Sequence, residues 1–190
     1  MPGFWKNRFR TVAWALLAAG LLSSCAGLRE GARPYTLTLL HINDHHSHLE
    51  PQPRTLQLDA GTGAPVAVAV DAAGFARVAA AFESLAQAAG PQVLKLHAGD
   101  ALTGTLYFNR AGAAGAADAA LMNTVCFDAF TLGNHEFDKG DAGLKGFLDV
   151  LRQGPCKTPA LSANVHFGAG SALHPSRAPG VVQPSVVLER

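Results

Sequence analysis

His41-Ile42-Asn43-Asp44-His45-His46-Ser47-His48 is the stretch that decides the fold, because it places one carboxylate and four imidazoles directly after the apolar run 35–40. We expect that run to be a buried strand, and open α/β folds build their sites at the carboxyl edge of such strands. Side chains two residues apart in an extended segment point the same way, so Asp44 and His46 can converge on one cation. A single histidine here would be an ordinary surface residue, but the cluster predicts a metal site.

Two later stretches repeat the pattern of an apolar run followed by potential ligands. Val93-Leu94-Lys95-Leu96-His97-Ala98-Gly99-Asp100 ends in Gly-Asp, and Ala129-Phe130-Thr131-Leu132-Gly133-Asn134-His135-Glu136 ends in Gly-Asn-His-Glu. Each run delivers oxygen or nitrogen ligands at the same edge of the predicted sheet. Three motifs in this order are far more specific than one Gly-Asp or Asn-His pair.

The other segments alternate between strand and helix patterns, which indicates α/β layering. The expected elements are a hairpin at 56–70 with turn residues 59–63, helices at 75–89 and 113–125, a helix between the cap Asp141 and the stop Gly154-Pro155, and strands at 93–98, 129–132 and 159–165. We expect the hairpin to cover an edge of the sheet and to carry no chemistry. The chain ends on the apolar run 181–188, which looks like a further strand, and we interpret the chain as a fragment.

The ordered triple of motifs resembles the metallophosphoesterase (calcineurin-like) superfamily. The spellings N-D-H-H-S-H-L-E and G-N-H-E-F-D are similar to its secreted 5'-nucleotidase branch. The runs H-A-G-D-A-L-T-G-T-L-Y, M-N-T-V-C-F-D-A-F and L-S-A-N-V are most similar to the periplasmic NAD 5'-nucleotidases within that branch. The resemblance covers residues 35–190 and implies a four-layer α-β-β-α sandwich, of which this chain holds the first half.

The resemblance assigns a metal role to four residues. It implies that Asp44 and His46 bind one divalent ion, that Asp100 bridges two ions, and that Asn134 binds the second ion through its amide oxygen. Such a pair of ions lowers the pKa of a shared water and neutralises charge as that water attacks phosphorus. Imidazole and carboxylate together suit zinc, manganese, iron or cobalt, so the metal is not identified.

The resemblance assigns a different role to His135. The family's histidine at this position faces the leaving-group oxygen and pairs with an aspartate three residues on, here Asp138. An imidazolium stabilises charge on the phosphoryl group or protonates the departing oxygen, and the carboxylate orients it and raises its pKa. The alternative for Asp138 is a helix cap. Glu136 is expected to support the ligands from behind, and His45 either does the same or is exposed to solvent.

The function implied by the resemblance is metal-dependent hydrolysis of phosphoester and pyrophosphate bonds in extracytoplasmic nucleotides, with NAD cleaved to NMN and AMP and then to nucleosides. Hydrolysis of UDP-sugars or of 2',3'-cyclic nucleotides is an alternative within the enzyme class. A surface lipoprotein that binds metal or nucleotide without catalysis is an alternative from another class. The family's later histidine ligands and its second, nucleotide-binding domain are missing from these 190 residues, so we expect the fragment itself to be weakly active or inactive.

Composition fits this interpretation and excludes one class of partner. Charged residues make up 15% and hydrophobic residues 48% of the chain, which is a globular composition. A formal net charge of +1 gives no basic field for binding nucleic acid through its phosphates. We therefore expect a nucleotide substrate, no nucleic acid partner, and membrane contact only through a lipid anchor.

The amino terminus has the pattern of an export signal. In residues 1–25, Lys6, Arg8 and Arg10 precede the apolar run 11–22, which is too short for a permanent membrane span. Leu22-Ser23-Ser24-Cys25 resembles a bacterial lipobox with Cys25 as the lipidated residue, and a plain secreted form is the alternative. Residues 26–34 then read as a tether, and 35–190 as the amino-terminal part of the phosphoesterase domain in a periplasmic or lipid-anchored protein.

The remaining cysteines, Cys126 and Cys156, form an even pair. In an oxidising compartment this pair predicts a disulfide, and two buried thiols are the alternative.

Overall fold

The computed structural model describes residues 34–190 except 60, 62 and 114. The predicted export signal, Cys25 and residues 26–33 of the tether lie outside the described residues. The chain divides into two units, Met1–Thr36 and Leu37–Arg190, and the fold below is that of the second. Among the described helices, none is long and apolar enough to cross a membrane.

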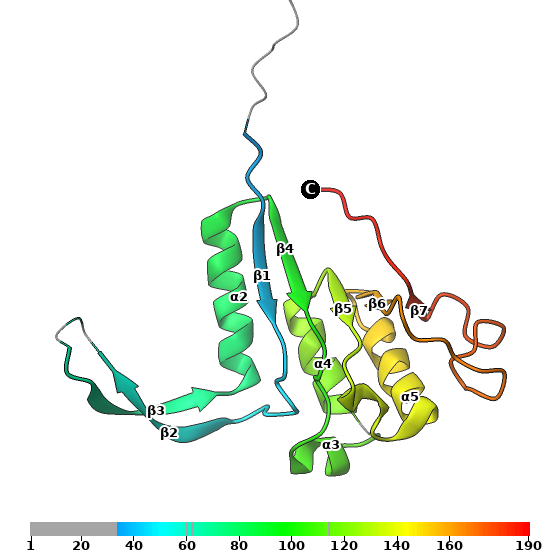
Figure 1. The fold of residues 1–190 in the computed structure, drawn as a ribbon, viewed down its shortest axis with the longest axis horizontal. Coiled ribbons are helices and arrows are strands. Elements are labelled where there is room, and N and C mark those ends of the chain that lie inside the picture. Colours follow the sequence, from blue (N-terminus) through cyan, green and yellow to red (C-terminus); the bar gives the residue numbers. More distant parts are fainter. Residues whose placement is uncertain (1–33, 60, 62, 114) are drawn as a thin grey trace, which may run out of the picture. The chain divides into compact units, whose positions relative to one another are not determined.

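A five-stranded parallel sheet organises the second unit (Figure 1). Its strands, in spatial order, are β1 (Thr38–Ile42), β4 (Val93–His97), β5 (Ala129–Thr131), β6 (Ala160–Leu161) and β7 (Val182–Gln183). Neighbouring parallel strands need crossover connections, which here are made chiefly by the helices α2 (Phe75–Ala89), α4 (Ala116–Val125) and α5 (Gly140–Gln153). The predicted α/β class is therefore confirmed, and the five-stranded sheet of the described residues is parallel throughout.

The core lies between the sheet and these helices. Four residues of α5 at helical spacing are fully buried: Leu144, Phe147, Leu148 and Leu151. The ring of Phe147 packs edge-on against Phe130 of β5, with centroids 5.7 Å apart. The predicted helix is present and ends before Gly154, but its first residue is preceded by Lys139. Asp141 therefore lies in the first turn, where its charge favours the positive end of the helix, and it is not the cap.

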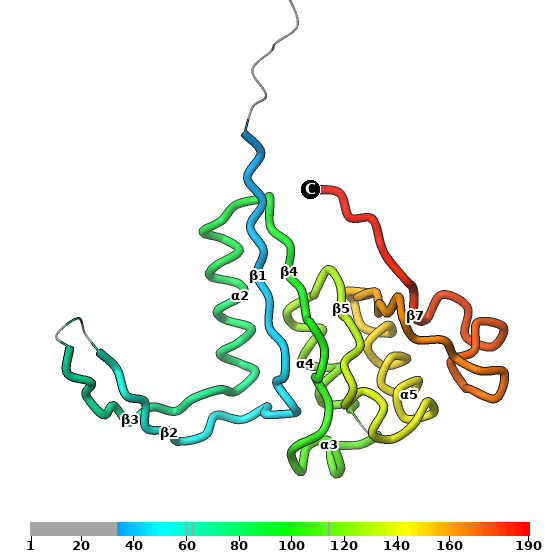
Figure 2. Tube along the Cα trace, in the orientation of Figure 1, coloured from blue at the N-terminus to red at the C-terminus, as the bar shows by residue number. Residues whose placement is uncertain are grey.

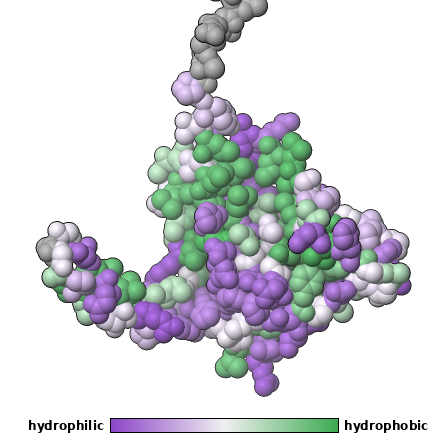
Figure 3. Space-filling model, in the orientation of Figure 1, coloured by the Kyte–Doolittle hydropathy of each residue, from purple (hydrophilic) through white to green (hydrophobic). Residues whose placement is uncertain are grey.

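The opposite face of the sheet is not covered by any described helix or strand. The burial of β1 alternates, and the side chains that face away from the core are exposed, with Leu39 at 56%. The register pairs Leu39 with Leu94 and His41 with Leu96, so the same face continues onto β4. Figure 3 shows hydrophobic residues gathered over β1 and β4 on this face. The described residues thus form one helical layer and one sheet, which are two of the four layers expected.

The predicted hairpin is present, but its predicted position is wrong. Strands β2 (Pro51–Leu58) and β3 (Val66–Ala73) pair antiparallel and form a separate two-stranded sheet that is almost entirely exposed. Asp59 Oδ1 accepts hydrogen bonds from the backbone N–H groups of Gly61 and Gly63, which stabilises the turn locally. Because every ladder bond of the hairpin is internal, it does not cover an edge of the main sheet.

The structure also differs from the sequence prediction in short elements. The expected strands 159–165 and 181–188 shrink to the two residues each of β6 and β7. Two short helices were not predicted, α3 (Leu106–Arg110) and the 3-10 turn η1 (His135–Phe137). Local side-chain bonds create such elements, as when the Thr105 hydroxyl accepts from the backbone N–H of Tyr107.

A disulfide joins Cys126 and Cys156, whose Cα atoms are 5.0 Å apart. Cys126 follows the last residue of α4 in a left-handed conformation, and Cys156 lies just after α5. The bond therefore ties together the C-terminal ends of α4 and α5.

Candidate metal centre

Three loops meet at the carboxyl edge of the sheet, one after each of β1, β4 and β5 (Figure 2). The first two are joined by backbone hydrogen bonds that continue beyond the ends of the strands. Asp44 N–H donates to the Gly99 carbonyl at 3.0 Å, and His46 N–H donates to the Asp100 carbonyl at 3.2 Å. These bonds hold the D-x-H and G-D motifs side by side, as their positions after neighbouring strands predict.

The backbone that carries the motif residues is unusual. Asp44, His46 and Asp100 all have positive φ angles, of 52°, 43° and 51°. Left-handed conformations are costly for residues other than glycine, and in native proteins they cluster at functional sites. The first strand ends at Ile42, so the expectation that Asp44 and His46 share a face of an extended segment is wrong. A turn brings them together instead, with Asp44 Oδ1 lying 3.5 Å from His46 Nε2.

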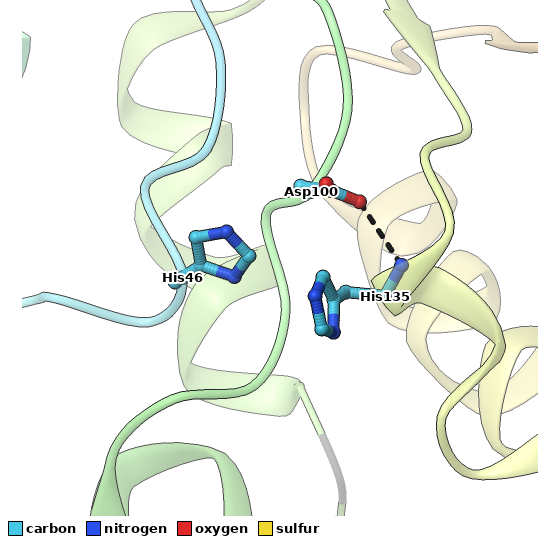
Figure 4. Close-up of side chains that lie close together, drawn as sticks. All are labelled: His46, Asp100 and His135. Atoms are coloured by element: carbon cyan, nitrogen blue, oxygen red, sulfur yellow. Dashed lines mark hydrogen bonds between the residues drawn. The ribbon is translucent and has the colours of Figure 1, made fainter.

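Side chains from the three loops form one cluster. His46, Asp100 and His135 each offer a potential ligand atom, and these atoms lie within 4.8 Å of one another (Figure 4). The rings of His46 and His135 meet edge-on, with centroids 4.8 Å apart. Asp44 lies at the rim of the cluster, half-exposed, and a hydrogen bond from the Asn43 amide lowers its pKa.

Asn134 and His135 lie on the third loop. Asn134 is exposed, and the backbone on both sides of it is fixed, since Gly133 N–H donates to Glu136 and His135 N–H donates to Asp100 Oδ1 at 3.0 Å. The cluster includes His135, which the family resemblance treats as a catalytic residue and not as a ligand.

Asp138 contacts His135 and does not cap the start of α5, although its backbone closes the short η1 turn. The His135 Nδ1 and Asp138 Oδ2 atoms are 2.9 Å apart, while the residue that precedes α5 is Lys139. This hydrogen bond raises the pKa of His135, which favours the imidazolium form. The Thr103 hydroxyl lies 3.3 Å from the same ring nitrogen.

Glu136 fastens the second and third loops to each other. Its side chain is buried, at 1% exposure, and accepts hydrogen bonds from the backbone N–H groups of Asp100, Ala101 and Gly133 at 3.0, 2.8 and 2.6 Å. Burial raises the pKa of Glu136, and the three donors partly oppose that shift. Glu136 therefore supports the Asp100 and Gly133 loops through these three hydrogen bonds, in line with the supporting role expected for it.

The glycine of the G-N-H-E motif is required by the closeness of these loops. A Cβ atom at Gly133 would lie 2.2 Å from Asp100 Oδ1 and 2.7 Å from the Asp100 nitrogen. Any larger residue would displace the carboxylate from the cluster, so the absence of a side chain at Gly133 makes room for Asp100.

His45 is buried behind the cluster, so the alternative that it is exposed to solvent is wrong. Its two ring nitrogens lie 2.9 Å from His97 Nε2 and 3.2 Å from Asp118 Oδ1. Asp118 was not singled out in the sequence. The available signal was a lone carboxylate in the alanine-rich segment 113–120, but that position could not be assigned to the site without the packing of α4.

The donor set at this edge fits divalent metal ions. Two imidazoles and a carboxylate on three separate loops, with a second carboxylate at the rim, are the ligands that zinc, manganese, iron and cobalt accept in proteins. Hydrogen bonds from the Asp100 and Ala101 N–H groups to Glu136 hold this loop, and the Asp100 carboxylate lies near both histidines, which suits a shared ligand.

Comparisons with known proteins find similar sequences and structures over most of this chain. The model of the calcineurin-like phosphoesterase family matches residues 37–171. The chain is 47% identical over 169 residues to a probable 5'-nucleotidase of Treponema pallidum (strain Nichols), an alignment that covers 89% of this chain and 26% of that protein. It is 42% identical over 169 residues to the NAD 5'-nucleotidase of Haemophilus influenzae, with 87% of this chain and 26% of that protein covered.

A solved structure, that of the H. influenzae NAD nucleotidase, superimposes with a TM-score of 0.64 at 44% identity. The match covers 78% of this chain and 23% of that chain. The chain therefore spans about a quarter of the length of the relatives that it matches.

Proposed function

The chain belongs to the calcineurin-like phosphoesterase family, and on this basis we propose that the protein hydrolyses phosphoester and pyrophosphate bonds of nucleotides outside the cytoplasm, using two divalent metal ions. The observation that carries the proposal is the meeting of His46, Asp100 and His135 from three loops at one edge of the sheet. The 5'-nucleotidase names of its relatives support nucleotides as the substrate class.

Four side chains would hold the metal ions. Asp44 and His46 are the proposed ligands of one ion, Asn134 of the other, and Asp100 is the proposed bridge. When bound, the ions supply Lewis acidity and a water of lowered pKa. The Gly133 backbone and the Glu136 carboxylate keep the Asp100 loop in place, so the protein does not have to order that loop when it binds metal.

His135 is the proposed catalytic residue of this chain. Asp138 raises the pKa of His135 and fixes the ring through Nδ1, which leaves Nε2 as the atom that can face substrate. An imidazolium at this position stabilises negative charge on the phosphoryl group or donates a proton to the departing oxygen. The exposure of the pair is consistent with access for a nucleotide.

NAD is the proposed preferred substrate, cleaved to NMN and AMP and then to nucleosides. The support is that one relative and one solved structure, both from Haemophilus influenzae, are named NAD nucleotidases. Both align with most of this chain. We further propose that residues 1–25 direct export and that Cys25 anchors the protein by a lipid at the cell envelope, with residues 26–34 as the tether.

Release of phosphate and of nucleoside monophosphates from four substrates tests the proposal. The full-length protein is assayed with added Mn²⁺ or Zn²⁺ on NAD, AMP, UDP-glucose and 2',3'-cyclic AMP, beside the Asp100→Asn variant and the 190-residue chain. We expect turnover of NAD and AMP by the full-length protein, loss of turnover in the variant, and little or none in the short chain.

Each other outcome contradicts a definite part of the proposal. Hydrolysis of UDP-glucose or the cyclic nucleotide without hydrolysis of NAD would replace the proposed substrate. Metal binding by the full-length protein with no turnover on any of the four would favour a binding protein. Full activity of Asp100→Asn would contradict the proposal that Asp100 bridges the two metal ions.

A further inference from the structure

A buried chain of hydrogen bonds lies behind the metal loops, and the proposed reaction uses none of its side chains. His97 Nε2 lies 2.9 Å from His45 Nδ1, and His45 Nε2 lies 3.2 Å from Asp118 Oδ1. At the other end, the backbone N–H of Gly99 donates to His97 Nδ1 at 3.2 Å. The His45, His97 and Asp118 side chains are all shielded from solvent.

The Gly99 bond fixes the direction of every other bond in this chain. Since His97 Nδ1 accepts the amide hydrogen, it carries no proton, and a neutral His97 carries its proton on Nε2. That proton is donated to His45 Nδ1, so the His45 proton is on Nε2 and is donated to the Asp118 carboxylate. The reverse direction would require a histidine with no ring proton, which is not a form of neutral imidazole.

The surroundings of His97 favour this neutral form. Its ring packs edge-on against Phe127 and Phe130, with centroids 5.2 and 5.3 Å away. Burial, and secondarily the nearby His45, lowers the pKa of His97 to about 3.

Asp118 is costly where it lies. A buried carboxylate is strongly unfavourable unless its oxygens are bonded, and its Oδ2 atom has no hydrogen-bond partner among the described residues. The first turn of α4 offsets part of this cost through the helix dipole. A packing role alone would be met better by an apolar side chain, so the carboxylate needs another explanation.

The ends of the network explain it. His45 lies between Asp44 and His46, and Gly99 directly precedes Asp100, so the network reaches both loops that carry ligands. From α4, Asp118 orients the His45 ring, and through His97 the same chain of bonds ends on the Asp100 loop. The Asp118 carboxylate therefore helps to set the distance between the D-x-H turn and the Asp100 loop.

We propose that Asp118, acting through His45 and His97, is a positioning residue that holds the Asp44–His46 turn and the Asp100 loop at the separation needed to bind metal. This inference rests on the proposed function. The hydrogen bond that Asp118 makes is to His45 and not to a proposed ligand, so we expect its loss to weaken metal binding.

Metal titration of three variants of the full-length protein tests the proposal. Mn²⁺ binding is followed by calorimetry in Asp118→Leu, in Asp118→Asn and in Met122→Ala. Asp118→Leu removes the acceptor and is expected to weaken Mn²⁺ binding by about tenfold or more, as loss of groups that orient metal ligands does. Asp118→Asn keeps an oxygen acceptor for His45 and is expected to keep most of the affinity.

Met122→Ala is the matched control, because Met122 is fully buried on the same helix and lies outside the network. It is expected to lower the thermal unfolding midpoint without changing Mn²⁺ affinity. Equal losses of affinity in Met122→Ala and Asp118→Leu would overturn the proposal, as would wild-type affinity in Asp118→Leu or an equal loss in Asp118→Asn. A wild-type protein that binds no Mn²⁺ or Zn²⁺ would instead refute the proposed function.

A second measurement needs no substitution and remains decisive if Asp118→Leu does not fold. Two-bond ¹H–¹⁵N spectra of the wild-type protein labelled at histidine report which ring nitrogen carries the proton. The network requires the Nε2–H form for both His45 and His97. A proton on Nδ1 of His97 would contradict the hydrogen-bond direction and the proposal with it.

Discussion

Two of the histidine–aspartate pairs among the described residues are similar in length and lie in opposite surroundings. The nitrogen and oxygen atoms of His135 and Asp138 are 2.9 Å apart, and the two side chains are 39% and 40% exposed. The corresponding atoms of His45 and Asp118 are 3.2 Å apart, at 9% and 0% exposure. The first pair lies in the exposed part of the candidate metal centre, and the second is buried behind it.

The difference shows how burial decides what a histidine–carboxylate pair can do. In the exposed pair the carboxylate raises the pKa of His135, and water can solvate the imidazolium, so the ring holds a proton that it can give away. In the buried pair the second nitrogen of His45 is taken by His97, whose neutral form is fixed. The exposed pair suits proton transfer and the buried one suits orientation.

The strongest test of this contrast is removal of the exposed ring. If His135 is the proton donor, His135→Gln is expected to lower kcat of the full-length protein by about 100- to 10,000-fold, the range typical of general acid catalysis. The measurement is steady-state hydrolysis of AMP at saturating metal, with bound metal quantified in parallel. A variant that loses metal together with activity would indicate that His135 is a ligand.

Removal of its carboxylate partner is expected to have a smaller effect. Asp138→Asn keeps a hydrogen-bond acceptor but takes away the charge that favours imidazolium, so kcat should fall by about 10- to 100-fold. Stopped assays of AMP hydrolysis at fixed pH measure it. An unchanged kcat in Asp138→Asn would show that Asp138 has a structural role in the turn before α5 and no role in catalysis.

The buried network is tested by acid titration of stability. The folded-state pKa of His97 is about 3, below the 6.5 of an unfolded histidine, so the unfolded chain binds the extra proton between these values. The stabilisation by neutral His97 is complete above pH 6.5 and is lost as pH falls toward 3, at about 1.4 kcal/mol per pH unit. Urea unfolding from pH 7.5 to 5 is the measurement.

The matched variant is His97→Gln, which retains a donor and an acceptor and does not titrate. Its free energy of unfolding should fall less steeply with pH than that of the wild type. If the free energy of unfolding fell equally steeply with pH in both proteins, His97 would take up its proton as readily in the folded state as in the unfolded chain. That result would contradict a lowered pKa for His97.

An ordinary exposed ion pair is expected to show the smallest effect of the pairs compared. Lys145 Nζ and Asp149 Oδ2 are 2.6 Å apart on the solvent side of α5, and both are partly exposed. Lys145→Met should lower the free energy of unfolding by no more than about 0.5 kcal/mol in low salt, and by less at 1 M salt. A cost of several kcal/mol would show that exposure is a poor guide to the strength of such pairs in this protein.

The sequence predicted the parts of the site that depend on strand order. Asp44, Asp100 and Asn134 follow consecutive parallel strands of the sheet, and parallel strands bring their carboxyl ends to one edge, so apolar runs and polar motifs were sufficient. The pairing of His135 with Asp138 came from the family motif.

The parts that depend on backbone conformation and packing were out of reach. Nothing in the letters of the D-x-H motif indicates that Asp44 and His46 are left-handed. Asp118 is far from His45 in the sequence, and only the packing of α4 under the sheet brings them together. The hairpin was found from its turn residues, but its place was not, because its position depends on tertiary contacts that no local pattern encodes.

The bare side of the main sheet has a practical consequence. Leu37 and Leu39 are 40% and 56% exposed there, and apolar patches of this kind promote self-association of soluble proteins. The purified 190-residue chain should therefore aggregate as its concentration rises. Dilute buffers, or a soluble fusion partner beside that surface, are the sensible conditions for purifying it.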